Sequence, residues 1–276
     1  MTEIPQLIHA AVLGLMQGLA EFLPISSSAH LVIIPEILGW PYLGKAFDVA
    51  LHFGTLLALL VVFKDDVITL LRGTKNLFLR SPDADPGESS LVLKLIVGCI
   101  PAGVIGLAFE DVIEEKLGGL LFVAAMLIGW GVLLELADRK QNTEGGRTLK
   151  DLTFRDAVII GCAQAAALMP GTSRSGSTIT TALFLGFTRT EAARFSFLLS
   201  LPVVAGASLL KGIKMANDPS TVEILGPLMV GILVSAVSGF LCIKYFLKYL
   251  RNNSFRPFVI YRIVLGLFLI SWALNH

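Results

Sequence analysis

Between positions 17 and 30 the chain concentrates polar side chains that can take part in catalysis. Three consecutive serines stand there between Glu21 and His30. A carboxylate or an imidazole can take the proton of a serine hydroxyl and so activate it as a nucleophile. The segment therefore predicts nucleophilic chemistry. The alternative is that the serines cap the helix that follows them.

Gln17 and Glu21 are four positions apart, so in a helix they share one face. The residues around them are apolar, and a carboxylate at membrane depth costs about 2.5–3.5 kcal/mol on insertion scales. We therefore expect Glu21 to have a partner or a function, and Arg174 is the candidate partner. That pair can staple two parts of the chain and also serve catalysis. Gln17 is either an interhelical hydrogen-bonding residue or a substrate contact.

A second polar segment, Pro-Gly-Thr-Ser-Arg-Ser-Gly-Ser-Thr at 170–178, has the composition of an anion site. Hydroxyls and the N–H groups at the start of a helix suit phosphate oxygens, and Arg174 adds a planar guanidinium. Glycines at 171 and 176 would let a ligand approach the backbone closely. A capping loop whose arginine only holds Glu21 is the alternative. Neither a Walker lysine nor a dinucleotide glycine pattern occurs, so nucleotides are not indicated.

The composition places these segments in a membrane protein. Of the 276 residues, 54% are hydrophobic and 16% charged, whereas soluble domains carry about 25% charged residues. The net charge of +1 argues against a nucleic-acid partner. The three cysteines lie in apolar stretches and are interpreted as small hydrophobic residues. The N-terminus lacks the features of a signal peptide, so we expect position 4 onward to be mature structure.

Charge-free runs predict the helices. The runs are 4–20, 22–35, 49–63, 95–109, 117–134, 157–173, 175–188, 195–210, 224–243 and 263–275. Most reach the length of about 20 residues that a span needs once flanking charged residues are included. The first two runs, and the pair at 157–188, are interrupted by a proline and hydroxyl-rich stretch, and each pair is either two spans or one re-entrant hairpin. His52 lies in an uninterrupted run and is expected to be an ordinary polar residue.

Weak internal matches favour the hairpins. Gly14 and Gln17 match Gly161 and Gln164, and Ser27 matches Ser173, with further matches in the same order downstream. The fold class we predict is all-α, integral to the membrane. It has two inverted-topology repeats, at about 1–140 and 150–276, each a re-entrant hairpin plus three transmembrane helices.

Basic residues predict the orientation. The segments 64–94, 138–156, 188–194 and 244–256 hold sixteen lysines and arginines, against four on the opposite side. The positive-inside rule places these four segments in the cytoplasm. Both termini would then lie outside.

Together, these residues resemble the bacterial undecaprenyl-diphosphatase family, also called bacitracin-resistance proteins. The resemblance covers essentially the whole chain and lies in Gln-x-x-x-Glu at 17–21, Pro-x-Ser-Ser-x-x-His at 24–30 and Pro-Gly-x-Ser-Arg-Ser-x-x-Thr at 170–178. It implies a multi-pass phosphatase of the bacterial cytoplasmic (inner) membrane. The enzyme would convert undecaprenyl diphosphate to the monophosphate and so recycle the lipid carrier of peptidoglycan synthesis. The partners would be this polyprenyl diphosphate and membrane lipids, and a homodimer is left open.

By position, the resemblance implies that Glu21 is the essential acid. Ser27 and His30 would be nucleophile and acid–base group, in either order, at a site open to the periplasm. The residues expected to bind substrate are Gln17, Ser26, Gly171, Ser173, Arg174, Ser175 and Thr178. Many members have glutamate where this chain has Gln17, which excludes a carboxylate metal ligand at that position.

Charge arithmetic predicts a divalent cation. A lipid diphosphate carries about three negative charges, by analogy with phosphomonoesters. Arg174 and two helix N-termini compensate only part of that charge, and Glu21 adds a further negative charge. A hard cation such as Mg²⁺ or Ca²⁺ would close the balance, with Glu21 as a ligand.

A secondary transporter or lipid flippase is the rival hypothesis, because inverted repeats with broken helices are typical of transporters. Binding alone, however, needs no serine nucleophile beside a carboxylate and an imidazole, and this favours the enzyme.

Overall fold

The computed structural model describes residues 3–79, 85–116, 118–140, 145–216 and 224–275. Their helices are α1 (Glu3–Ala20), α2 (Ser27–Leu38), α3 (Lys45–Val62), α4 (Lys64–Leu79), α5 (Pro86–Lys116), α6 (Leu120–Arg139), α7 (Phe154–Ala166), α8 (Arg174–Phe184), α9 (Arg189–Ala216), α10 (Leu225–Leu250) and α11 (Arg256–Asn275). In the described part of the chain the only extended pairing is an isolated bridge between Arg147 and Phe187. The predicted all-α class is confirmed.

Five of the described helices are long and apolar enough to cross a membrane: α5, α6, α9, α10 and α11. A sixth candidate is α3 together with α4, although the two helices are bent by 88° at their junction. Apolar side chains are exposed along these helices, among them Leu107, Leu233 and Val264. Such exposure is expected where the surrounding solvent is lipid. The chain is a multi-pass membrane protein.

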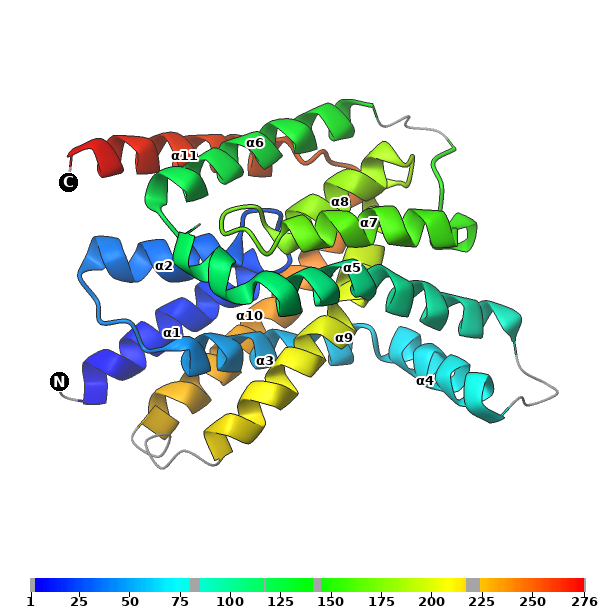
Figure 1. Cartoon of the computed structure of the whole chain (residues 1–276), viewed down its shortest axis with the longest axis horizontal. Helices are drawn as coiled ribbons and strands as arrows, with labels where there is room; N and C mark the ends of the chain where they lie inside the picture. The colour runs from blue at the N-terminus through cyan, green and yellow to red at the C-terminus, as the bar shows by residue number, and fades with distance from the viewer. Residues whose placement is uncertain (1–2, 80–84, 117, 141–144, 217–223, 276) are drawn as a thin grey trace.

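Two helical hairpins occupy the middle of the molecule. α1 packs against α2, and α7 packs against α8, and their loops lie close together (Figure 1). α7 has 13 residues and α8 has 11, so neither reaches the 20 residues of a span. α1 and α2 are likewise shorter than a typical span. The interruptions predicted at 21–28 and 170–178 are therefore real breaks, which the structure places at 21–26 and 167–173.

Each hairpin packs against a helix from the other half of the chain. α1 lies against α10, and α7 lies against α5. Glycines make both contacts possible. A Cβ added at Gly14 would be 2.7 Å from the carbonyl oxygen of Gly231, and one at Gly161 would overlap that of Gly98. A side chain at either position would therefore separate the helices.

The helices extend beyond the charge-free runs. The segment 64–94, expected as a loop, contains α4 and the start of α5, and α5 continues past position 109 to Lys116. The first turn of α4 contains Asp65 and Asp66, which favour a helix N-terminus, and the helix exposes Ile68 and Leu71. A charged residue ends an apolar run but does not end a helix. The charge-free runs are therefore shorter than the helices that contain them.

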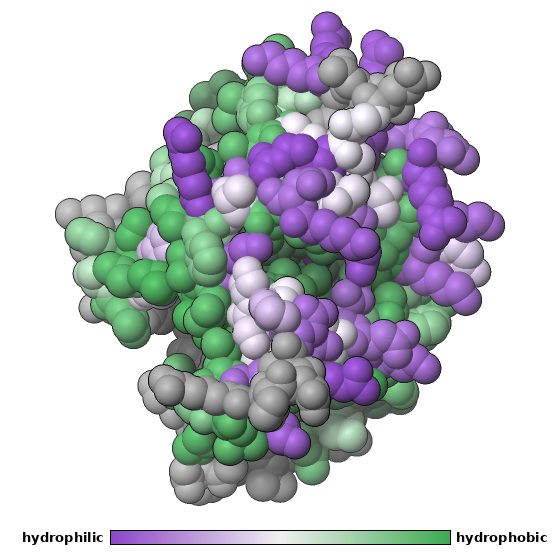
Figure 2. Space-filling view, turned by 90° about the vertical axis from the view of Figure 1, so that its right-hand side faces the viewer, coloured by the Kyte–Doolittle hydropathy of each residue, from purple (hydrophilic) through white to green (hydrophobic). Residues whose placement is uncertain are grey.

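The two ends of the molecule differ. Both termini lie at the left of Figure 1, whereas α4 and the end of α6 extend to the right. Hydrophilic residues cover much of that right-hand end (Figure 2). Ion pairs join helices there, including Arg189 to Asp138 at 2.5 Å and Arg194 to Asp66 at 2.9 Å. The basic segments predicted to share one side therefore gather at a single polar end.

Candidate active site

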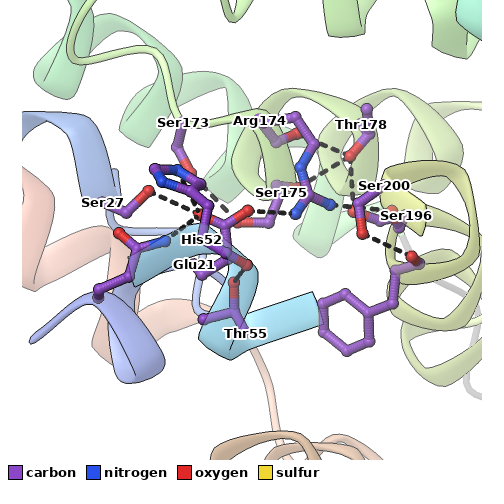
Figure 3. A network of polar contacts seen from close by, with 12 residues as sticks. Glu21, Ser27, His52, Thr55, Ser173, Arg174, Ser175, Thr178, Ser196 and Ser200 are labelled. Carbon is purple, nitrogen blue, oxygen red and sulfur yellow. Dashed lines mark hydrogen bonds and ion pairs between the residues drawn. The ribbon is translucent and has the colours of Figure 1, made fainter. Parts of the chain in front are cut away.

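Glu21 is the centre of the polar network that joins the two hairpin loops (Figure 3). It follows the last residue of α1 and is 7% exposed. Its Oε2 accepts hydrogen bonds from Gln17 Nε2 at 3.1 Å and Ser27 Oγ at 2.9 Å. Its Oε1 accepts a bond from Arg174 Nη2 at 2.7 Å. The predicted pairing of Glu21 with Arg174 is confirmed, and a serine hydroxyl shares the same carboxylate.

Arg174 is the first residue of α8, and its guanidinium is held from two sides. Nη1 donates to the carbonyl oxygen of Ser196 at 2.9 Å, while Nη2 donates to Glu21. Thr178 donates to the Arg174 carbonyl at 2.7 Å and contacts the Ser196 hydroxyl at 2.7 Å. Thr178, expected to bind substrate, is thus fully buried behind the arginine, where it fixes α8 against α9.

The residues at the N-cap positions of α2 and α8 share a backbone geometry, although of the two only Ser173 makes a side-chain capping hydrogen bond. Ser26 and Ser173 have φ values of 74° and 72°, and no other described residue besides glycine has positive φ. Each hydroxyl lies 3.2 Å from the hydroxyl two positions on, in Ser28 and Ser175. Ser26, one residue before the predicted match, is therefore the counterpart of Ser173. Ser175 Oγ in turn donates to the Leu23 carbonyl at 3.0 Å, which ties one loop to the other.

A pocket of about 500 Å³ opens beside this network. Its polar lining is Glu21, Ser27, Ser28, His52, Gln164, Ser173 and Arg174, and its apolar lining is Val49, Ala102, Ala167, Leu168, Val203, Val204 and Ala207. Four predicted site residues therefore line one cavity, namely Glu21, Ser27, Ser173 and Arg174. Gly171 does not line it, because the space where its side chain would lie is filled by Val123 and Met126 of α6.

His52 is a member of the site that sequence reasoning missed. Its Nε2 lies 3.5 Å from Glu21 Oε2 in the pocket wall. Its Nδ1 is 2.8 Å from the Asp48 carbonyl oxygen, which can only accept, so Nδ1 carries a proton and Nε2 is left to face the carboxylate. The signal was present, since polar residues inside an apolar span are commonly functional.

Gln164 was also overlooked as a site residue, although it matches Gln17 in the repeat. Within the described part of the chain, neither atom of its buried amide makes a hydrogen bond. It lines the pocket. Because an unsatisfied buried amide is costly, the side chain is suited to bind a polar ligand there.

His30 is placed apart from the pocket lining, although it was expected to be a catalytic residue. Its Nδ1 lies 2.7 Å from the Ser26 carbonyl oxygen, and its Nε2 lies 2.6 Å from the Tyr261 hydroxyl. The side chain is buried, with 3% exposed. The geometry brings Ser27 and His52 to Glu21, whereas His30 holds the backbone before α2.

The donor set fits a divalent cation only if the substrate supplies further ligands. Among the described residues there is no group of three His, Cys, Asp or Glu side chains that could hold a metal. Glu21 is a single carboxylate, and the buried Oε1 of Gln17 has no hydrogen-bond partner within the described residues. Mg²⁺ is often bound by one or two carboxylates together with substrate phosphates and water. One carboxylate and one amide oxygen match that mode.

Comparison with known proteins identifies close relatives. The family model described as bacitracin resistance protein BacA matches residues 10–268. An undecaprenyl-diphosphatase of Hahella chejuensis is 50% identical over 265 residues, which cover 96% of this chain and 97% of that protein. One from Campylobacter curvus is 45% identical, covering 96% and 98%. One from Geobacter metallireducens is 45% identical, covering 98% and 99%.

Proposed function

This chain belongs to the bacitracin resistance protein family, and we propose on that basis that it hydrolyses undecaprenyl diphosphate. The products would be undecaprenyl phosphate and inorganic phosphate, which returns the lipid carrier to use. The observation that supports hydrolysis is the contact of Ser27 Oγ with Glu21 Oε2 at 2.9 Å, beside Arg174. Transport needs an anion site but no hydroxyl held against a carboxylate.

The pocket suits the two parts of such a lipid. Arg174 and the N–H groups at the start of α8 lie where they can bind phosphate oxygens. Apolar side chains of α5 and α9, including Ala102, Val203 and Ala207, line the pocket and would contact the first isoprene units. The diphosphate would thus be bound at the hairpin loops with its chain directed between these helices.

In the proposed reaction Ser27 Oγ attacks the terminal phosphorus. The bond from phosphorus to the bridging oxygen breaks as the Oγ–phosphorus bond forms, and undecaprenyl phosphate leaves with the bridging oxygen. The serine proton passes to Glu21 Oε2. His52 Nε2 is placed to take this proton from Glu21 and pass it to a water molecule in the pocket. Water then releases phosphate from Ser27. Arg174 stabilises the charge on the transferring group.

Glu21 has a second candidate role as cation ligand, with the free Gln17 oxygen beside it. A bound Mg²⁺ or Ca²⁺ would neutralise phosphate charge in the transition state. The residues of the chain still supply the nucleophile, the proton acceptor and the arginine. Glu21 would orient Ser27 in either role.

We further propose that the two halves are inverted repeats in the bacterial inner membrane, with both termini and the pocket mouth on the periplasmic side. Two observations support the repeat. Ser26 and Ser173 have nearly equal φ values, and Gly14 and Gly161 each pack closely against a glycine in the other half of the chain. The polar end opposite the termini carries the basic segments and would face the cytoplasm (Figure 2). The hairpin loops would then meet inside the membrane, as in folds with broken helices.

The test is phosphate release by the purified full-length protein in detergent with undecaprenyl diphosphate. We expect turnover by the native protein and a loss of at least about 10³-fold in Ser27→Ala. Ser271→Ala, on the last helix and outside the pocket, is the matched serine control and should retain activity. Movement of the lipid across vesicles without phosphate release would instead support the transporter.

A further inference from the structure

Arg262, on α11, is the largest fully buried side chain among the described residues, with 0% exposed. In the described part of the chain no carboxylate forms an ion pair with it. A buried charge without a counterion is expensive unless hydrogen bonds satisfy it. Its retention therefore needs a structural or functional reason.

Within the part of the chain that the structure describes, the guanidinium donates only to backbone carbonyl oxygens. Nε bonds to Leu127 at 3.0 Å and Nη2 to Met126 at 3.2 Å, both on α6. Nη1 bonds to Pro24 at 3.0 Å, in the loop of the first hairpin. Nη2 also bonds to Gly171 at 3.1 Å and Thr172 at 2.9 Å, in the loop of the second hairpin. One side chain therefore holds both loops and α6 at once.

The carbonyls of the hairpin loops need such a donor. Pro24, Gly171 and Thr172 lie outside the helices, so helical hydrogen bonding does not satisfy them, and inside a membrane no bulk water replaces it. Pro24 lies just before Ser26 and Ser27, and Thr172 lies just before Ser173 and Arg174. The bonds of Arg262 therefore end next to the residues that meet at Glu21.

Gly176 shows that the chain makes room for this side chain. A Cβ added at Gly176 would lie 2.8 Å from Arg262 Nη1. Because the guanidinium is bonded on several sides, it could not move away without losing a contact. The glycine that was expected to admit a ligand instead admits the arginine beneath the first turn of α8.

We propose that Arg262 is a positioning residue for the hydrolysis, which sets the register between the two hairpin loops so that Ser27, Glu21 and Arg174 meet. This proposal rests on the proposed function. Arg262 itself touches none of these three side chains. Lysine cannot replace it, because one ammonium has three donors at a single point and cannot reach carbonyls on three elements.

The first test compares Arg262→Lys with Arg189→Lys in full-length purified protein. Arg189 joins helices at the polar end through Asp138 and does not line the pocket. We expect Arg262→Lys to lower kcat at least about 100-fold with KM within about threefold, because misplaced groups lose transition-state contacts. Arg189→Lys should lower the melting temperature while leaving kcat near native below it. An Arg262→Lys that only melts earlier, with native kcat, would overturn the proposal.

The second test does not depend on activity. Spin labels at Val32 on α2 and Val158 on α7, both exposed, report the separation of the hairpins once Cys99, Cys162 and Cys242 are replaced by alanine. We expect a narrow distance distribution in the native background and in Arg189→Lys, and a broad or shifted one in Arg262→Lys. An unchanged distribution would refute the positioning role even if the protein hydrolysed another substrate.

Gly176→Ala is the second variant, in case Arg262→Lys does not fold. It keeps every donor of Arg262 but places a Cβ 2.8 Å from Nη1 and 3.0 Å from Ser173 Cβ, so a Ser173→Ala variant serves as the control for the second contact. We expect a kcat loss of about tenfold and a broadened distance distribution. Native kcat in this variant would contradict the tight fit on which the proposal depends.

Discussion

Ser26 and Ser173 adopt the same left-handed backbone conformation, with φ of 74° and 72°, immediately before α2 and α8. Such a conformation costs about 1–3 kcal/mol for a residue other than glycine and persists only where the surroundings impose it. Ser173 Oγ accepts a hydrogen bond from Gly176 N at 3.0 Å, so the conformation aims its hydroxyl at the new helix. Strain at these two positions therefore shapes the loops that form the pocket.

Replacing Ser26 tests this strain. Ser26→Gly removes the strain but also the contact with Ser28, so stability should change by less than about 1 kcal/mol. Ser26→Val should destabilise by at least about 2 kcal/mol, because a β-branched side chain disfavours positive φ. Thermal unfolding in detergent measures the stability of both variants. Equal melting temperatures would contradict the conclusion that the backbone of Ser26 is strained.

Arg174 should be indispensable and not replaceable by lysine. Arg174→Ala should lower kcat by about 10²–10³-fold, as expected for loss of a group that stabilises transition-state charge. Arg174→Lys should recover only part of the loss, because one ammonium cannot contact both Glu21 and the Ser196 carbonyl while binding phosphate. Phosphate-release kinetics decide this, and native turnover in Arg174→Lys would exclude the role of the planar guanidinium.

Substitutions of His52, on α3, and of His30, on α2, should have different effects. His52→Leu should lower kcat about tenfold or more with little change in melting temperature, because His52 lines the pocket beside Glu21. His30→Leu should lower melting temperature and kcat together, since it loses the contacts with Ser26 and Tyr261.

Tyr261→Phe separates these cases, because it removes only the hydroxyl partner of His30. It should reproduce a mild form of the His30→Leu defect and leave the effect of His52→Leu unchanged in the double variant. If His30→Leu abolished kcat at native stability while Tyr261→Phe had no effect, His30 would be the chemical group after all.

Removal of divalent cations should abolish turnover, and Mg²⁺ or Ca²⁺ should restore it. The charge of a diphosphate exceeds what Arg174 and the helix N-termini supply, and Glu21 is itself negative. Glu21→Gln should raise the cation concentration needed for half-maximal activity if Glu21 is a ligand. Full activity after exhaustive chelation would show that the chain alone balances the charge.

The orientation can be tested with single cysteines at Gly119 and Gly145, in a background without native cysteines. Gly119 lies between α5 and α6, and Gly145 lies between α6 and α7, so the two positions flank opposite ends of α6. An impermeant thiol reagent added outside should label position 119 in intact cells, and position 145 only after permeabilisation. Labelling of both from one side would remove the odd number of spans per half and, with it, the inverted repeat.

The amino-acid sequence alone was enough to predict the all-α membrane class, the two helix breaks and the pairing of Glu21 with Arg174. Each depends on local chemistry: apolar runs, prolines beside hydroxyl clusters, and the cost of an unpaired charge in a membrane. The first two signals are carried by neighbouring residues, whereas the pairing of Glu21 with Arg174, 153 positions apart, follows from the cost of leaving either charge unpaired in a membrane.

Only the tertiary structure gave the contacts of His52, His30 and Arg262. A charge-free run began at 263, which placed Arg262 at a helix end, whereas the residue lies inside α11 and faces the hairpin loops. The sequence favoured His30, beside the serines, over His52, in an uninterrupted run, yet His52 faces Glu21 and His30 contacts Tyr261. Which partner a buried polar group finds depends on how distant helices pack, and residue spacing along one helix does not contain that information.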